Sequence, residues 1–340
     1  MRILIIKPSS LGDVVHSLPF LKAIRDTFQD AHIEWVITRD LKDVLEGNPL
    51  INGLIVFNKD SWNRPKNFSR TVKEALELVK TLRTRHYDMV VDLQGLLRSG
   101  LMAFFTHSPL KIGFKHSREC SWLFYNRKIS VNGTLHAVDR YLEIAKSVGA
   151  KMKQVEFPLY IDDTEKGKIK SLIGNLQEYI VIVPSARWET KRWPPENFGM
   201  LISKLSIPCV ITGSSADKQV VQQVMASSNG KGMDLCGKTN LKGLIALIAG
   251  AKAIVSNDSG PMHIGTALGV PVIALFGPTD PVRTGPYGWS EIRAKQKNKN
   301  LRVIKISIPC SPCFKKKCKD PLCMNGINVE TVLEGIKEYL

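Results

Sequence analysis

The hydrophobic positions of this chain form short continuous runs, and longer segments with mixed polar and apolar positions separate them. Short apolar runs of this kind are typical of strands buried in a parallel sheet. We predict strands in the first half at 2–6, 33–37, 53–57, 89–92, 111–113 and 128–130. We predict strands in the second half at 179–183, 209–212, 234–235, 253–256 and 272–276. Strands that alternate with helices predict two parallel sheets with helices on both faces.

The two halves begin with the same order of elements. In the first, a strand leads into the loop 7–13 and a helix over 14–27; in the second, a strand leads into the loop 184–195 and a helix over 196–205. We therefore predict an α/β protein with two Rossmann-like, doubly wound domains facing across a cleft. The boundary is placed at 165/166, so the N-terminal domain covers 1–165 and the C-terminal domain covers 166–340.

The segment 256–281, SNDSGPMHIGTALGVPVIALFGPTDP, contains the most specific pattern in the chain. Asp258 stands at the end of a predicted strand, Ser259 and Gly260 suit the start of the next helix, and His263 falls in its first turn. A helix N-terminus at the carboxyl end of a parallel sheet favours an anion, and a nucleotide diphosphate fits best. The alternative is an ordinary strand–helix crossover with a capped helix.

The loop PSARWETKRWPP, which begins at 184, combines small residues with cations. Ser185, Arg187 and Lys191 suit phosphate binding, with the lysine acting as a point charge. The Walker pattern and the dinucleotide G-x-G-x-x-G pattern are both missing from the sequence, which argues against an ATPase and a classical dehydrogenase. Surface cations on a loop remain the alternative.

The first loop, KPSSLGD, places Ser10, Gly12 and Asp13 after the first predicted strand. Gly12 permits a close approach between the backbone and a ligand. Asp13 could remove a proton from a sugar hydroxyl as a general base, or it could only cap the helix that follows.

Four further residues of the first half carry side chains suited to an anionic acceptor. Gln94 lies at a strand end, and Arg118, His136 and Arg140 add cations and hydrogen-bond donors. Each of them, taken alone, also fits a structural role.

The formal net charge of +17 is concentrated in two stretches. Residues 291–319 hold ten Lys or Arg against one Glu, and residues 57–86 hold eight against three acids, interleaved with Phe57, Trp62 and Phe68. Such stretches favour an anionic lipid surface or a phosphorylated substrate, or else form a solvated basic face. Motifs that bind nucleic acid do not accompany the charge, so no nucleic-acid partner is expected.

The N-terminal apolar run before Pro8 is too short for a signal peptide, and apolar runs of membrane-spanning length do not occur in the sequence. We therefore expect a cytoplasmic protein.

Seven cysteines, an odd number, fit a reducing compartment. Four of them form a C-x2-C-x4-C-x4-C pattern, at Cys310, Cys313, Cys318 and Cys323. This cluster could bind zinc or an iron–sulfur centre, form redox pairs, or remain as reduced thiols.

The motifs KPSSLGDVVHSLP, DLQGLLRSG, TKRWP and NDSGPMHIGTALGVPVIALFGPTDP, in this order, resemble glycosyltransferase family 9, the ADP-heptose:lipopolysaccharide heptosyltransferases. With SWLFYNRK and HAVDR, the chain is most similar to the heptosyltransferase I group. The resemblance implies a GT-B fold and inverting transfer of heptose from ADP-L-glycero-D-manno-heptose to Kdo of the lipopolysaccharide inner core. It also implies an enzyme at the inner face of the cytoplasmic membrane, held there through basic and aromatic patches. No cofactor is required, although a divalent cation could stimulate transfer.

The resemblance also implies roles for particular residues. Asp13 matches the family's catalytic base, and Lys191 matches the lysine that holds the diphosphate. The motif around the donor sugar and phosphates matches Asp258, Ser259, Gly260 and His263. The cationic positions suggested for the Kdo carboxylates match Arg118, His136 and Arg140.

The chain departs from the group by having Ala186 and Arg187 where the enteric enzymes have two threonines. Alternatives left open are heptosyltransferase II- or III-like transfer to a heptosylated core, a nucleotide-sugar 2-epimerase, and a non-catalytic module that binds anionic lipid.

Overall fold

The computed structural model describes residues 1–58, 68–292 and 298–340, and it divides into two compact units, Met1–Tyr160 and Ile161–Leu340. The predicted boundary at 165/166 falls inside α6 (Asp163–Ile173). Because α6 packs against α9 (Leu241–Ala249) of the second unit, the whole helix belongs to that unit.

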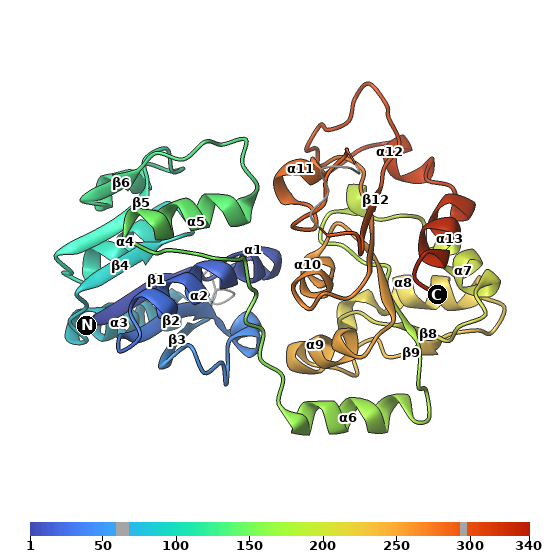
Figure 1. Cartoon of the computed structure of the whole chain (residues 1–340), viewed down its shortest axis with the longest axis horizontal. Helices are drawn as coiled ribbons and strands as arrows, with labels where there is room; N and C mark the ends of the chain where they lie inside the picture. Colours follow the sequence, from blue (N-terminus) through green and yellow to red (C-terminus); the bar gives the residue numbers. More distant parts are fainter. Residues whose placement is uncertain (59–67, 293–297) are drawn as a thin grey trace. The chain divides into compact units, whose positions relative to one another are not determined.

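The first unit is built on a six-stranded parallel sheet (Figure 1). Its strands are β1 (Arg2–Ile6), β2 (His32–Thr38), β3 (Gly53–Phe57), β4 (Met89–Asp92), β5 (Leu110–Phe114) and β6 (Arg127–Ile129). Its helices are α1 (Leu11–His16), α2 (Leu18–Thr27), η1 (Arg39–Val44), α3 (Phe68–Thr84), α4 (Leu97–Phe105), η4 (Ser121–Phe124) and α5 (Ala137–Ser147). Helix α2 packs against α5, and α3 packs against α4.

The predicted helix over 14–27 is two helices. Helix α1 ends at His16, and α2 begins at Leu18 with Pro19 in its first turn. A proline in a helix interior would remove a hydrogen bond and clash with the preceding turn, so it is placed at a helix start. The hydroxyl of Ser17, between the two helices, donates to the Val14 carbonyl at 2.7 Å.

The second unit also holds a six-stranded parallel sheet. Its strands are β7 (Ile180–Val183), β8 (Cys209–Ile211), β9 (Met233–Asp234), β10 (Ala253–Asn257), β11 (Val272–Leu275) and β12 (Leu301–Ile304). Besides α6 and α9, its helices are η5 (Glu189–Lys191), α7 (Pro195–Lys204), η6 (Ser215–Asp217), α8 (Lys218–Ala226), α10 (Gly260–Ala267), α11 (Pro281–Thr284), α12 (Leu322–Asn325) and α13 (Val329–Lys337).

Strand β12 is not among the predicted strands, and its residues lie within the basic stretch 291–319. It pairs with β11 in parallel register, Val272 opposite Leu301 and Leu275 opposite Ile304. Leu301 and Ile304 are buried, whereas Arg302 between them is half-exposed. An edge strand needs burial at only some of its positions, so its hydrophobic run is interrupted.

Both sheets have the same topology. The first runs β3-β2-β1-β4-β5-β6 and the second β12-β11-β10-β7-β8-β9, which is the 3-2-1-4-5-6 order when each unit's strands are counted from its own first strand. This order confirms the prediction of two Rossmann-like, doubly wound domains. In such sheets a ligand binds at the carboxyl ends of the strands where the order reverses. These switch points lie between β1 and β4 and between β7 and β10.

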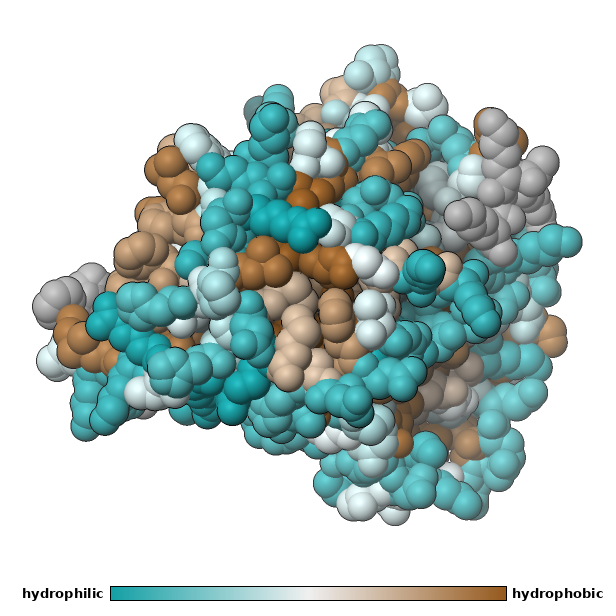
Figure 2. Space-filling model, turned by 60° about the vertical axis from the view of Figure 1, so that its left-hand side comes forward, coloured by the Kyte–Doolittle hydropathy of each residue, from teal (hydrophilic) through white to brown (hydrophobic). Residues whose placement is uncertain are grey.

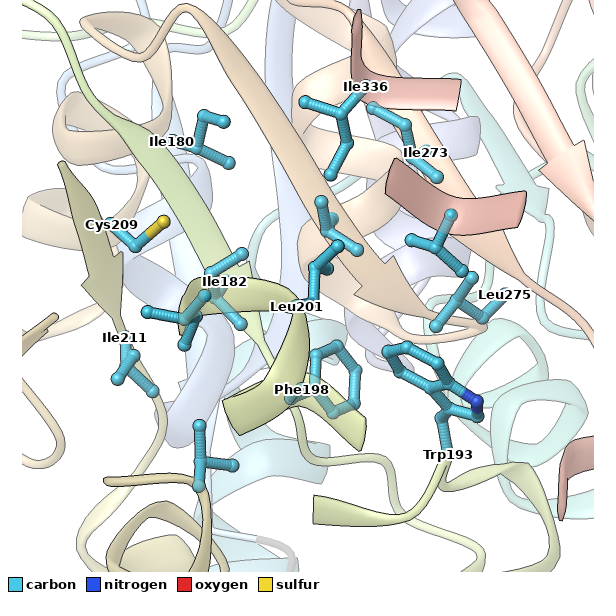
Figure 3. Packing of buried hydrophobic residues seen from close by; sticks show 14 of the residues in the cluster. Ile180, Ile182, Trp193, Phe198, Leu201, Cys209, Ile211, Ile273, Leu275 and Ile336 are labelled. Atoms are coloured by element: carbon cyan, nitrogen blue, oxygen red, sulfur yellow. The ribbon is translucent and has the colours of Figure 1, made fainter. Parts of the chain in front are cut away.

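The core of the second unit holds the first residues of α7 and the loop before it. Trp193 and Phe198 are fully buried and meet edge-to-face, with ring centroids 4.9 Å apart (Figure 3). The indole N–H of Trp193 donates to the carbonyl of Ile327 at 3.0 Å. This anchor fixes the end of the loop that follows β7. Among the helices of the described residues, none is both long enough and apolar enough to cross a membrane.

Candidate active site

The predicted base, Asp13, lies in the first turn of α1, at the carboxyl end of β1. Its Oδ2 accepts hydrogen bonds from the backbone N–H of Ser10 at 3.1 Å and from the Ser10 hydroxyl at 2.7 Å. Asp13 therefore does cap its own helix. Its side chain nevertheless remains 41% exposed, so capping leaves the carboxylate accessible to a substrate.

A buried lysine stands behind this carboxylate. Lys7 Nζ lies 4.0 Å from Asp13 Oδ1 and 5.5 Å from the centre of the Tyr141 ring. Burial alone lowers the pKa of Lys7, but Asp13, Tyr141 and Asp92 together outweigh it, so the pKa of Lys7 lies above its ordinary value. Lys7 is therefore a permanent cation beside Asp13. Lys7 lies in the loop 7–13, and the sequence motifs alone indicate no role for it.

The loop after β4 lies next to the loop after β1. Gln94 accepts, through Oε1, a hydrogen bond from the Ser9 N–H at 3.4 Å. The loop is shaped by Asp92, whose Oδ1 accepts from the N–H groups of Gln94 and Gly95 and whose Oδ2 accepts from the Tyr125 hydroxyl at 2.6 Å. Burial raises the pKa of the Asp92 carboxyl in spite of these donors.

The start of α5 contributes His136 and Arg140 to the same end of the sheet. The rings of His136 and His16, on α1, have centroids 5.0 Å apart, and His136 Nδ1 accepts from the Val138 N–H. Arg140 lies over the Phe114 ring at 5.2 Å, and its Nε is buried without a hydrogen-bond partner among the described residues. A buried donor in this state can be satisfied by a ligand.

The predicted acceptor residues thus gather around the carboxyl ends of β1, β4 and β5. Arg118 is exposed, and its backbone N–H donates to the Gly95 carbonyl at 3.1 Å. A cavity of about 500 Å³ opens beside Ser9 and Gln94, and its walls include the apolar side chains of α4. Its lining consists of Pro8, Ser9, Thr38, Phe57, Gln94, Leu96, Leu97, Arg98, Ser99, Leu101, Met102 and Glu119.

In the second unit, the loops after β7 and β10 are joined by one buried side chain. Asn257 Nδ2 donates to the Pro184 carbonyl at 2.7 Å, and its Oδ1 accepts from the Trp193 N–H at 3.1 Å. Because this amide holds both ends of the β7 loop, Ser185, Arg187 and Lys191 are fixed relative to the start of α10.

Lys191 and Asp258 form an ion pair. Lys191 Nζ lies 2.6 Å from Asp258 Oδ2, which also accepts from the Thr279 hydroxyl at 2.6 Å. Both side chains of the ion pair are largely buried. Lys191 and Asp258 come from two separate sequence motifs, and the structure brings them into direct contact. Asp258 can therefore hold the ammonium group of Lys191 in one place.

Ser185 and the start of α10 offer hydrogen-bonding groups beside this pair. Ser185 Oγ is buried and has no partner within the described part of the chain. Ser259 is the N-cap of α10 and makes no capping hydrogen bond with its side chain, whose hydroxyl lies 3.1 Å from that of Ser256. Gly260 begins the helix, and His263 is buried one turn on. Backbone N–H groups at a helix start and a buried serine hydroxyl suit a phosphate.

Part of the basic stretch 291–319 lies against the β7 loop. The Thr190 hydroxyl donates to the Lys315 carbonyl at 2.8 Å. The Trp188 ring has two cations near it, Lys191 Nζ at 4.6 Å and Lys316 Nζ at 5.4 Å from its centroid. These contacts could not be found from the sequence, because 125 positions separate the two bonded residues, Thr190 and Lys315.

Of the three aromatic residues singled out in the stretch 57–86, only the side chain of Phe57 lies within the described residues. Phe57 is buried in β3 and lines the cavity beside Ser9. Trp62 and the side chain of Phe68 lie outside the described residues, as do residues 293–297 of the second basic stretch.

The four C-terminal cysteines are near one another in the structure. Burial raises the pKa of the Cys323 thiol, and Cys313, Cys310 and Cys318 raise it further. All seven cysteines of the chain are free thiols. Within residues 1–58, 68–292 and 298–340, no group of three or more His, Cys, Asp or Glu side chains is arranged to hold a metal ion. The structure therefore adds no support to zinc or an iron–sulfur centre here.

The two Rossmann-like domains place the chain in the class of proteins with the GT-B fold, which the E. coli heptosyltransferase WaaC shares. The chain belongs to glycosyltransferase family 9 (heptosyltransferase), whose family model matches residues 75–323. The resemblance found in the sequence and the predicted GT-B fold are both confirmed.

Heptosyltransferases 1 and 3 of one strain are similar to this chain to nearly the same degree. Lipopolysaccharide heptosyltransferase 1 of Escherichia coli K12 is 29% identical over 313 residues, covering 88% of this chain and 95% of the relative. Lipopolysaccharide heptosyltransferase 3 of the same strain is 31% identical over 293 residues, covering 82% and 83%.

Solved structures match both units. A family 9 glycosyltransferase from Veillonella parvula has a TM-score of 0.83 at 26% identity, over 99% of this chain and 96% of that one. The E. coli heptosyltransferase WaaC with ADP-2-deoxy-2-fluoro heptose has a TM-score of 0.77 at 26% identity, over the full length of both chains.

Proposed function

We propose that this glycosyltransferase moves heptose from ADP-L-glycero-D-manno-heptose to Kdo of the lipopolysaccharide inner core, with inversion at the anomeric carbon. The donor follows from the similarity to WaaC, which has been solved with an ADP-heptose analogue. The observation that supports the proposal best is the Lys191–Asp258 pair beside the buried hydroxyl of Ser185.

In the proposed mechanism, the second unit binds the donor. The Lys191 ammonium and the N–H groups at the start of α10 stabilise the negative charge that develops on the departing diphosphate. Ser185 and Ser259 donate further hydrogen bonds, and Arg187 adds an exposed cation at the edge of the loop. Asp258 keeps Lys191 in position, and His263 lies in the turn below and orients the sugar.

The first unit binds the acceptor. Asp13 accepts the proton of the attacking Kdo hydroxyl as that oxygen bonds to the anomeric carbon and the ADP leaves. Ser10, Gly12 and Gln94 border the acceptor beside Asp13, and Arg118, His136 and Arg140 pair with its carboxylates. The unpartnered Nε of Arg140 is the feature of this site that a carboxylate would satisfy. This chemistry needs no cofactor.

A second acceptor has specific support. The identity to heptosyltransferase 3 is as high as that to heptosyltransferase 1, which favours transfer to an already heptosylated core equally. Mass spectrometry of the products made from ADP-heptose with Kdo2-lipid A, and separately with a heptosylated acceptor, distinguishes the two. Heptose added to Kdo2-lipid A supports the proposal. Product from the heptosylated acceptor alone shows the second function, and release of a free sugar without either acceptor shows an epimerase or hydrolase.

A further inference from the structure

Helix α4 and the short helix η4 expose an unusual amount of apolar surface. On α4 the exposed apolar residues are spaced by four and three positions, which places them on one face of the helix. The residues and their exposed fractions are Leu97 (44%), Leu101 (36%), Phe104 (48%), Trp122 (37%) and Leu123 (61%). We call these five residues the α4–η4 surface.

The two helices hold this surface together as one unit. The rings of Phe104 and Phe124 meet with centroids 5.9 Å apart. Gly100 allows the close packing, because a Cβ at that position would lie 2.7 Å from Phe124 Cδ2 and 3.1 Å from Ser121 Cβ. The Leu97 N–H donates to Glu119 Oε2 at 3.0 Å. The surface is therefore a fixed part of the fold and not a loose loop.

The segment that carries the α4–η4 surface is strongly basic. Residues 97–128, all of which the structure describes, contain six Lys or Arg and a single acid, Glu119. The cations are Arg98, Lys111, Lys115, Arg118, Arg127 and Lys128. Lys128 Nζ lies 5.0 Å from the centre of the Trp122 ring. Exposed tryptophan and leucine among cations match an interface between acyl chains and anionic headgroups.

The surface is continuous with the cavity near the acceptor residues. Leu97 and Leu101 belong to the α4–η4 surface and also line the cavity that contains Ser9 and Gln94. A lipid-linked acceptor held in a bilayer against this surface would reach the cavity without leaving the membrane.

Figure 2 shows one face of the molecule, on which hydrophobic residues lie at the surface between hydrophilic ones. Exposed apolar groups that are clustered and bordered by charge mark interaction sites.

We propose that the α4–η4 surface docks on a bilayer that contains anionic lipid. The leucines and aromatic side chains enter the level of the headgroups, and the surrounding cations pair with lipid phosphates. This surface differs from the two basic stretches that the sequence singles out. The purpose of docking rests on the proposed lipid-linked acceptor, but its test does not, because vesicle binding is measured without donor or acceptor.

The test is co-sedimentation with vesicles of phosphatidylcholine, with and without phosphatidylglycerol. The wild type binds the anionic vesicles and binds neutral ones weakly. The double variant Phe104→Ser/Leu123→Ser lowers the partition coefficient about tenfold or more. The matched control Leu172→Ser/Met200→Ser, which removes two similarly exposed apolar residues from the second unit, binds like the wild type.

A second, independent variant protects the test against misfolding. Lys115→Glu/Lys128→Glu changes only exposed side chains, and we expect it to reduce binding to anionic vesicles while leaving thermal unfolding unchanged. The proposal is overturned if the wild type does not bind anionic vesicles. It is also overturned if Phe104→Ser/Leu123→Ser and Lys115→Glu/Lys128→Glu both bind them as strongly as the wild type does. A third result also overturns the proposal: the wild type self-associates, Phe104→Ser/Leu123→Ser is monomeric, and the two proteins bind vesicles equally. The surface would then join two copies of the chain.

Discussion

At the scale of single residues, the proposed base Asp13 is a partly exposed carboxylate beside a buried cation. A general base has to be ionised and accessible. Lys7, a buried cation, lies 4.0 Å from Asp13 Oδ1, and the two donors of Ser10 fix the orientation of the carboxylate. The exposed part of the side chain remains available to a substrate hydroxyl.

We expect Asp13→Ala to lower kcat for heptose transfer by about 10²- to 10⁴-fold, because the attacking hydroxyl loses its proton acceptor. The donor affinity stays at the wild-type value, since the proposed donor residues lie in the second unit. Initial-rate kinetics and calorimetric titration with ADP measure the two effects. Asp26→Ala, which removes an exposed aspartate paired with Lys22, serves as the control and should retain activity. Turnover near the wild-type rate in Asp13→Ala would exclude Asp13 as the base.

The buried Asp92 makes a pH-dependent contribution to stability. Because burial raises its folded pKa, the folded state holds this proton more tightly than the unfolded chain does. The contribution of Asp92 is therefore largest below its unfolded pKa of about 4, and it is lost as the pH rises through the folded pKa.

Asp92→Asn keeps an acceptor for the N–H groups of Gln94 and Gly95 but cannot ionise. We expect its free energy of unfolding to rise, relative to the wild type, as the pH increases from about 4 towards neutrality. Urea denaturation at several pH values measures this difference. Parallel stability profiles for the two proteins would contradict a raised pKa.

At the scale of elements, the proposed donor site depends on segments far apart in the sequence. Asn257, from β10, holds the loop after β7 through a hydrogen bond to the Pro184 carbonyl. Two cations lie near the Trp188 ring of this loop: Lys191 from the same loop and Lys316 from the C-terminal segment. Because Lys316 is exposed, water and salt weaken the electrostatic attraction between its ammonium group and a bound anion.

We expect Lys316→Ala to weaken ADP binding a few-fold, corresponding to about 0.5 kcal/mol, as is usual for an exposed cation. Lys191→Ala, which removes a largely buried cation and leaves Asp258 without its partner, should weaken binding about tenfold or more. Lys319→Ala, a nearby exposed lysine with no contact to Trp188 in the described structure, is the matched control. Calorimetric titration at low and high salt measures all three. Equal affinities for Lys316→Ala and Lys319→Ala would show that the contact with Trp188 does not bear on the donor.

At the scale of the whole molecule, the chain uses the same six-stranded topology twice, and each sheet places its loops at its own switch point. The first and second units therefore present different chemistry on similar frames. The first offers a carboxylate, a histidine and an arginine with an unpartnered Nε, and the second offers an ion pair and a helix start.

Most of the strands could be predicted because each is a local event. The apolar residues of a run such as 253–256 predict a buried strand, and the residues of the loop after it predict the start of a helix. The exceptions have local reasons as well. The apolar run of β12 is interrupted by Arg302 at a sheet edge, and a second helix with Pro19 in its first turn begins within the predicted helix over 14–27.

The sequence by itself determined the fold class, the family and the loops that carry the chemistry, because apolar periodicity, glycine and proline positions and short motifs are encoded within a few residues. Only the tertiary structure decided that Lys191 pairs with Asp258, that buried Lys7 stands behind Asp13, and that the segment around Lys316 lies on the donor loop. It also decided which apolar residues of α4 and η4 stay exposed. These are contacts and burial between distant segments, and they depend on how the sheets bring strand ends together.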